Sequence, residues 1–190
     1  MEKESLYQLW MKRNPSWEKR YQDILINPYS DYGRGATQYN EDRGKVFGGG
    51  YEVFIIAFFL GLYLDQRKPL ATDSSKKKTF GFPIQQWGNL ESRNKRTAYG
   101  EELRKYIFAA LVARTEVDLI GLDKGELTPK ETVDALMKTM EEYTNAGFRH
   151  MAEMVDDNPN ILYKEGAFLD LFIPFITGEN QEEETLETLD

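Results

Sequence analysis

A glycine-rich stretch in front of an apolar segment is the first feature of this chain that could do chemistry. Residues 44–50 read GKVFGGG and lead directly into an apolar run. Backbone N–H groups at the start of a helix can bind a phosphate. A nucleotide-hydrolysing loop needs Gly-x4-Gly-Lys-Ser/Thr, but Tyr39 replaces its first glycine and Val46 its hydroxyl residue. The pattern therefore argues against nucleotide hydrolysis. It leaves a lone phosphate site or a tight turn that lets Tyr51 and Phe54 dock.

His150 is the only histidine in the chain, so any site that uses an imidazole must include it. Glu153 follows it by three residues, which is the spacing of the Glu-x-x-His pairs in carboxylate-bridged metal bundles. Here the order is reversed and only one copy exists, so a structural histidine is the better interpretation. The chain has no cysteine and no Gly-x-Ser-x-Gly motif, which argues against Ser-His and Cys-His catalysis. We therefore expect no cofactor and no metal ion.

Adjacent acidic residues occur at Glu141-Glu142 and at Asp156-Asp157. Glycosidases place two carboxylates on either side of a sugar and raise the pKa of one of them. The three tryptophans of the chain could stack on such a substrate. Because acidic residues on helix surfaces are normally solvated, a carboxylate-based hydrolase, acting on carbohydrate, is only an alternative interpretation.

Basic residues are concentrated in the middle of an otherwise acidic chain. The net charge is −8, but Arg34–Lys105 contains 13 Lys and Arg against 8 Asp and Glu, a net charge of +5. A basic region in an acidic protein indicates an anionic partner that contacts this region, unless it is ordinary surface variation. If the partner is DNA, we expect phosphate contacts from nine residues. These are Arg34, Arg43, Lys45, Lys76, Lys77, Lys78, Arg93, Lys95 and Arg96.

Arg114 lies in a largely apolar stretch, so a buried guanidinium that needs an acidic partner is expected there. Glu116 is only two residues away and would not share its helix face. Glu52 in the central apolar segment is therefore the expected partner, in an ion pair that stabilises the fold.

Length and composition favour a globular protein. The 190 residues are 41% hydrophobic, which is enough for one domain with a sizeable core. The absence of cysteine fits a reducing compartment, and the charged N-terminus does not resemble a signal peptide. The apolar run 51–64 is too short to span a bilayer about 30 Å thick. We therefore expect a cytoplasmic protein with no membrane contact.

Apolar periodicity predicts the elements that must position these residues. The segments expected to be helical are 4–12, 14–26, 50–64, 93–119 or 98–119, 129–156 and 165–177. Residues 27–50 and 65–90 show no such period and should form two long irregular loops. The sequence thus predicts an all-α fold, a single-domain bundle of about five to six helices over residues 1–177. An acidic disordered tail should follow at 178–190.

Several residues mark where helices start or break. Asn14-Pro15 has the form of a helix N-cap followed by proline at the first helical position. Thr128 and Glu131 form the pattern of a capping box. Gly147 either lets another helix approach closely or divides the long helix in two.

The core should centre on the apolar segment 50–64. The residues expected to be buried are Phe54, Ile55, Phe58, Leu111 and Met140. Residues of the second loop that should pack against this core are Phe80, Phe82, Ile84 and Trp87. Lys76–Lys78 should form the solvated tip of the same loop.

Four segments are informative through their order along the chain. They are 51–62 (YEVFIIAFFLGL), 66–70 (QRKPL), 107–120 (IFAALVARTEVDLI) and 141–148 (EEYTNAGF). This order resembles a small helical accessory family found beside DNA-phosphorothioation (Dnd) modification and restriction genes. The resemblance covers residues 46–155, and the chain departs from the family pattern at 1–45 and 71–100.

The resemblance implies a cytoplasmic, non-enzymatic accessory protein of a DNA-modification and restriction defence system, and it provides no catalytic residues. Such a protein would act through protein contacts or weak DNA-phosphate contacts, so a protein partner is expected and DNA is a second candidate. Two alternatives stay open. One is a helical protein-interaction module with no nucleic-acid role, and the other is the carboxylate-based hydrolase. The sequence does not indicate the oligomeric state.

Overall fold

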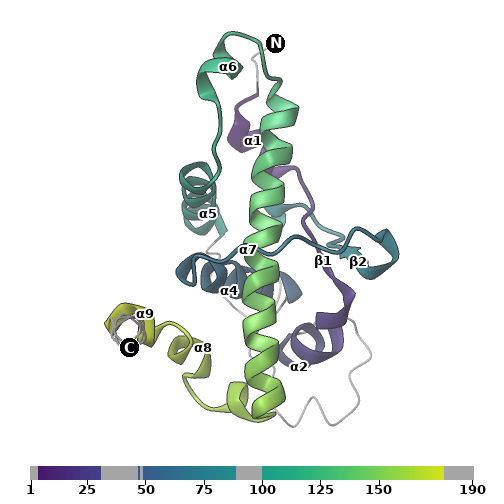
Figure 1. Cartoon of the computed structure of the whole chain (residues 1–190), viewed down its shortest axis with the longest axis vertical. Helices are drawn as coiled ribbons and strands as arrows, with labels where there is room; N and C mark the ends of the chain where they lie inside the picture. Colours follow the sequence, from purple (N-terminus) through teal and green to yellow (C-terminus); the bar gives the residue numbers. More distant parts are fainter. Residues whose placement is uncertain (1–3, 31–46, 48, 89–99, 178–190) are drawn as a thin grey trace, which may run out of the picture.

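One long helix, α7 (Pro129–Asp157), forms the spine of the molecule in the computed structural model, which describes residues 4–30, 47, 49–88 and 100–177 (Figure 1). Its start is the predicted capping box, in which Thr128 and Glu131 exchange hydrogen bonds. It ends at the residue before Asn158, and Pro159 follows.

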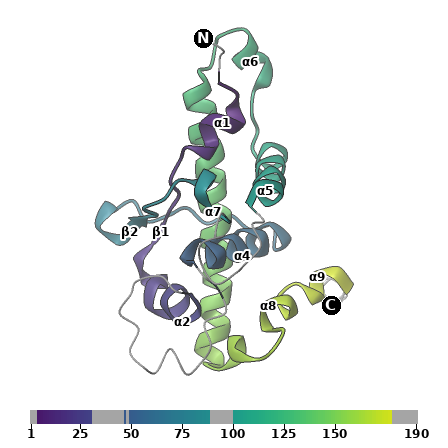
Figure 2. The ribbon, with the colours of Figure 1, turned by 180° about the vertical axis from the view of Figure 1, so that it is seen from behind.

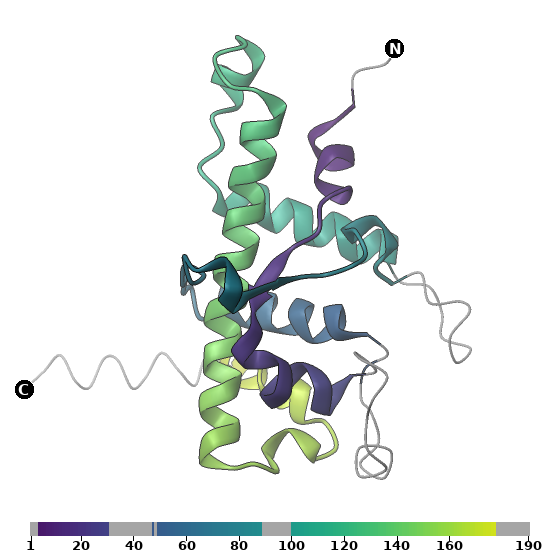
Figure 3. The ribbon, with the colours of Figure 1, turned by 90° about the vertical axis from the view of Figure 1, so that its right-hand side faces the viewer.

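The central apolar segment forms α4 (Gly50–Tyr63), which crosses α7 transversely (Figure 1 and Figure 3). Two glycines let the backbones touch at the crossing. A Cβ on Gly61 would overlap the carbonyl group of Tyr143, and a Cβ on Gly147 would overlap that of Ala57. Of the two alternatives predicted for Gly147, the structure shows the close approach of another helix, and α7 continues through this residue without a break.

The described elements share one hydrophobic core around this crossing. The five residues predicted to be core, Phe54, Ile55, Phe58, Leu111 and Met140, are all buried. The rings of α1 (Leu6–Met11) extend this core toward α5 (Gly100–Arg114), where Phe108 contacts Tyr7 and Trp10.

The segment after α1 differs from the expected helix over 14–26. Residues Ser16–Glu18 form a strand, β1, and the chain then continues as a 3-10 turn (Lys19–Tyr21), a π-helical turn (Gln22–Ile26) and α2 (Asn27–Tyr29). The reason is that distant residues supply the hydrogen bonds of this segment. Asn14 Nδ2 donates to the carbonyl of Phe80 at 2.7 Å, and the N–H of Ser16 donates to Glu141 at 2.7 Å. Tertiary bonds thus override a local helix signal.

The second expected loop, 65–90, contains regular structure. A 3-10 turn at Ser74–Lys76 leads into β2 (Lys77–Thr79), which pairs antiparallel with β1, and a second 3-10 turn follows at Ile84–Gln86. Lys77 and Lys78 are consequently half-buried strand residues, and only Lys76 is fully exposed. Phe80, Ile84 and Trp87 are buried as predicted, but Phe82 is exposed because the chain bends at 81–82.

The remaining predicted helices are shorter than expected. α5 ends at Arg114 and is followed by a separate helix, α6 (Leu119–Asp123). The last helix is divided into α8 (Ala167–Asp170) and α9 (Ile173–Thr177), preceded by a 3-10 turn at Ile161–Tyr163. Pro174 explains the division, because it provides no N–H for a helix that would run through it.

The described part of the chain is mostly helical, as the sequence predicts. It differs from the predicted all-α bundle of five to six helices in having eight α-helices and a two-stranded sheet. Among the described residues, no helix combines the length and apolar character needed to cross a bilayer. The tail at 178–190 lies outside the described residues.

Replacing either crossing glycine by alanine should destabilise the protein. Alanine has a helix propensity about 1 kcal/mol more favourable than glycine. Here its Cβ meets a backbone carbonyl that cannot move aside, so Gly147→Ala should lower the free energy of unfolding by about 1–3 kcal/mol. Urea denaturation measures this difference. Gly81→Ala is the matched control, because its Cβ would meet no neighbour within 4 Å. A stabilised Gly147→Ala variant would contradict the close approach.

Candidate nucleic-acid interface

Pairing of the two short strands places two basic segments side by side. Glu18 of β1 lies opposite Lys77 of β2. Segment 12–20 has four basic residues and one acidic residue, and segment 71–79 has three and one, which gives a net charge of +5. We name their cations the basic ridge: Lys12, Arg13, Lys19, Arg20, Lys76, Lys77 and Lys78. The two segments cross the same side of α7 (Figure 3).

The β2 lysines of the ridge pack with their stems against the protein. Lys78 Nζ donates to Gln22 Oε1 at 2.7 Å and lies 6.0 Å from the ring centroid of Trp17. Lys77 lies near Glu141 of α7 and lowers the pKa of that carboxyl group, although the larger effect of burial leaves the pKa raised. Because the aliphatic parts of these lysines are partly buried, their ammonium groups are held at fixed positions on the surface.

The other ridge cations differ in their pairing. Three form ion pairs within the protein: Lys12 with Glu4, Arg13 with Asp134 and Arg20 with Glu18. Lys19 and Lys76 are exposed, and no described carboxylate lies within ion-pair distance of either. The Lys12 and Arg13 pairs are exposed, and such pairs contribute at most about 1 kcal/mol, so a phosphate could replace these two carboxylate partners at small cost.

The carboxylate of Glu18, which is only 8% exposed, connects the ridge to α7. Its Oε1 accepts hydrogen bonds from the N–H of Ala71 at 2.9 Å and from Asn145 Nδ2 at 3.2 Å. Its Oε2 lies 2.6 Å from Arg20 Nε. One buried acidic group therefore fixes β1, the chain that leads to β2, and a ridge cation relative to one another.

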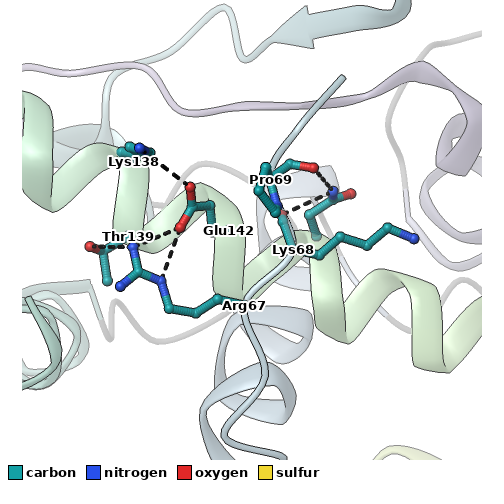
Figure 4. Close-up of polar contacts among 7 residues, drawn as sticks. Arg67, Lys68, Pro69, Lys138, Thr139 and Glu142 are labelled. Carbon is teal, nitrogen blue, oxygen red and sulfur yellow. Dashed lines mark hydrogen bonds and ion pairs between the residues drawn. The ribbon is translucent and has the colours of Figure 1, made fainter. Parts of the chain in front are cut away.

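A second buried carboxylate holds the chain that leads from α4 to β2 (Figure 4). Arg67 donates from Nε and Nη2 to Glu142 Oε2 at 2.9 and 2.6 Å, and its Nη2 also lies 3.4 Å from Thr139 Oγ1. Lys138 approaches the other carboxylate oxygen at 3.9 Å. Glu142 is 7% exposed, and its hydrogen bonds with Arg67 offset the cost of burying the carboxylate.

Asn145, one turn further along α7, completes this attachment by binding the chain at Lys68 and Pro69. Its Nδ2 donates to the carbonyl groups of Lys68 at 3.2 Å and Pro69 at 3.1 Å. Segments 66–70 and 141–148, which carry part of the family resemblance, therefore contact each other. Their polar residues stabilise the fold and position the ridge.

The structure places three of the nine predicted DNA-contacting residues. Lys76, Lys77 and Lys78 lie on the ridge. Six others fall outside the described residues: Arg34, Arg43, Lys45, Arg93, Lys95 and Arg96. Their role stays a prediction.

Sequence reasoning missed the N-terminal half of the ridge. Lys12, Arg13, Lys19 and Arg20 precede the basic region at 34–105 and were expected on or beside helices. A strand of three residues has too short a pattern to be detected by alternation. The useful signal was the cluster of cations on both sides of Trp17.

The glycine-rich stretch is described only at Phe47, Gly49 and Gly50. Gly49 precedes α4, and Tyr51 stacks on Trp87 with ring centroids 5.4 Å apart. Phe54 is fully buried. These contacts are those expected of a turn that lets the two rings dock, and they give no support to a phosphate cradle.

Arg114 corrects a prediction. It is exposed, and its Nη1 pairs with Asp65 at 2.9 Å instead of with Glu52. The reason is that α5 ends at Arg114, which leaves its side chain at the edge of the core.

Among the groups considered for catalysis, His150 is half-buried, and Glu141 and Glu142 bind other residues of the protein. Burial lowers the pKa of His150, against the opposing charge of Glu153, and Glu153 itself pairs with Arg149 at 3.7 Å. Glu141 and Glu142 bind Ser16 and Arg67 respectively, so the two carboxylates do not converge. Among the described residues, no group of three or more His, Asp or Glu side chains is placed to hold a metal ion.

Comparison with known proteins gives no relative: no family model, no curated protein and no solved structure matches the chain.

Glu141 beneath the ridge should give the protein a pH-dependent stability. Burial raises its pKa, so the native state binds this proton more tightly than the unfolded state does. The resulting stability is present below the ordinary carboxyl pKa and is lost as the pH rises through the raised one. Glu141→Gln keeps an acceptor for Ser16 and removes the ionisation. Urea unfolding should show that its stability relative to wild type is higher at pH 7 than at pH 4.

Glu131 provides the opposite control. Hydrogen bonds from the backbone N–H and the side chain of Thr128 lower its pKa. The stability from this group is present above the ordinary carboxyl pKa and is lost as the pH falls through the lowered one. Glu131→Gln should therefore lose more stability at pH 7 than at pH 4. The same pH trend in both variants would contradict the assignment.

Proposed function

We propose that this protein is a non-enzymatic accessory protein of a DNA-modification and restriction system that contacts DNA phosphates through the basic ridge. The observation that carries the DNA contact is the pairing of β1 with β2, which places two basic segments with a combined charge of +5 side by side in a chain of net charge −8. The defence context rests on the family resemblance of residues 46–155. It implies action in the cytoplasm, where such systems meet DNA.

The ridge fits a phosphate backbone better than it fits base edges. Its cations are mostly lysines on short strands and turns, and lysine binds phosphate as a point charge without the fork that reads a base. Phosphate contacts fix the position of a protein on DNA but carry no sequence information. We therefore expect weak binding that does not depend on sequence, as suits an accessory protein.

A protein partner remains the second candidate, and one observation favours it. Leu169, Ile173 and Ile176 of α8 and α9 are 62%, 39% and 67% exposed. They come from two short consecutive helices and add to the exposed apolar area at this end of the described chain. This surface lies on the side of α7 away from the β1–β2 sheet (Figure 1 and Figure 2). A protein-interaction module with no nucleic-acid role would use it alone.

Neutralising three ridge lysines, of which Lys19 and Lys76 are exposed and Lys77 is half-buried, should weaken DNA binding and its dependence on salt. The variant is Lys19→Gln, Lys76→Gln and Lys77→Gln, measured by fluorescence anisotropy with a labelled duplex at several salt concentrations. Each phosphate contact contributes about −0.9 to the log–log salt slope, so losing three should make the slope shallower by about 2–3.

The matched control is the combined Lys124→Gln, Lys130→Gln and Lys164→Gln variant, which makes the same change in net charge at exposed sites outside the ridge. Its affinity and slope should stay close to wild type. Equal loss in both triple variants would mean that net charge, and not the ridge, governs binding. No binding of the wild-type protein at low salt would leave the protein-partner function and remove the DNA contact.

Removing residues 179–190 should strengthen DNA binding. The segment carries six acidic side chains, which repel phosphates and compete with them for the ridge cations. The gain in affinity should be severalfold at low salt and should shrink as salt screens the charges. A full-length variant with these six residues changed to Gln or Asn should behave like the truncated one. Unchanged affinity in both would show that the acidic segment has no effect on the ridge.

A further inference from the structure

Phe82 is an exposed ring in a molecule whose neighbouring rings are buried. Its side chain is 64% exposed, whereas Phe80 and Trp87 are 5% and 2% exposed. A bend at 81–82 turns it out of the core. Single exposed apolar residues are ordinary on protein surfaces, so exposure alone gives this ring no role.

The backbone around Phe82 is held on both sides. The N–H of Phe80 donates to Pro15 at 3.1 Å, and the N–H of Ile84 donates to Arg13 at 3.0 Å. The carbonyl of Phe82 itself accepts from Trp87 Nε1 at 3.3 Å. The ring therefore projects to solvent from a fixed piece of chain, so little conformational entropy would be lost if a ligand packed on it.

The same hydrogen bonds place the ring at one end of the basic ridge. Segment 79–84 continues from β2 alongside residues 13–16, with Phe80 bonded to Pro15 and Ile84 bonded to Arg13. The backbone of Phe82 therefore lies between these two attachments, four residues beyond Lys78. Four residues of extended chain would span about 13 Å, and the bend at 81–82 makes the distance from Lys78 to Phe82 shorter than this. A strand whose phosphates follow the ridge would bring a base to this ring.

We infer that Phe82 is a base-stacking platform that makes the ridge prefer single-stranded DNA. The inference rests on the proposed DNA contact and adds its substrate class. An unpaired base can leave its neighbours and lie on an aromatic face, whatever its identity, while the lysines hold the adjacent phosphates. Paired bases in a duplex are stacked on each other and offer no free face to the ring.

The test compares a labelled single-stranded 20-mer with a duplex of the same length, using the full chain. Stacking contributes about 1–3 kcal/mol per base, so Phe82→Ala should weaken single-strand binding by about 5- to 150-fold. Duplex affinity should change little, and the salt slope of single-strand binding should stay the same, because no phosphate contact is lost. Phe82→Tyr keeps an aromatic face and should bind like wild type.

Tyr106→Ala is the control for loss of an exposed ring, since Tyr106 of α5 is 67% exposed and lies outside the ridge. It should leave both affinities unchanged. Because Phe82 is exposed, thermal unfolding should show that Phe82→Ala folds like wild type.

The outcomes separate the inference from the proposed function. If wild type binds DNA and Phe82→Ala binds single strands equally well, the stacking platform is wrong and the ridge function stands. Equal loss on single strand and duplex would also overturn it, since no base selectivity would remain. If wild type binds neither probe at low salt, the ridge function fails and the platform fails with it.

Discussion

The close approach of α4 and α7 is the constraint on which the rest of the structure depends. Gly61 and Gly147 each lie against a backbone carbonyl of the other helix, so the two backbones meet without side chains between them. Close packing of this kind fixes the crossing more strictly than interdigitated long side chains would, because no rotamer can change to accommodate a shift. Both ends of α4 are positioned by it. The N-terminal end carries Tyr51 to Trp87, and the C-terminal end delivers the chain to the polar side of α7.

The ridge follows from that position through buried polar groups. Glu142 and Asn145 hold the chain that leaves α4, and Glu18 joins this chain to β1. Each of these side chains is nearly buried, so each needs its partners to offset desolvation, and all three bind the same stretch of chain, residues 67–71. The polar network thereby selects one relative placement of β1 and β2. The cations at the surface are accordingly arranged by buried groups that never meet a ligand.

Sequence reasoning was successful where one continuous stretch of chain carries a long apolar pattern. α7 has a capping box and many turns of apolar period, and α4 is a continuous apolar run, so both helices and five core residues could be predicted. It failed at Ser16–Glu18, because the strand that pairs with this segment is Lys77–Thr79, far along the chain, and the local sequence does not indicate it. The N-terminal half of the ridge was missed for the same reason, because only the pairing of β1 with β2 brings Lys19 and Arg20 close to Lys76–Lys78. Phe82 was predicted to be buried, since a bend between two buried rings is not visible in their spacing.

The charge distribution explains how an acidic protein could use a basic ridge without binding anions elsewhere. Outside the ridge segments the chain carries far more acidic than basic residues, and this excess opposes the approach of a polyanion to the body of the protein. Repulsion from the body and attraction to the ridge together orient the encounter, with a net affinity that stays low. The apolar residues of α8 and α9 lie on the side of α7 away from the sheet and would stay open to a protein partner while DNA is bound. If the proposed function holds, two surfaces on opposite sides of α7 would let the protein contact DNA and a protein partner together, because neither contact would have to be broken for the other to form.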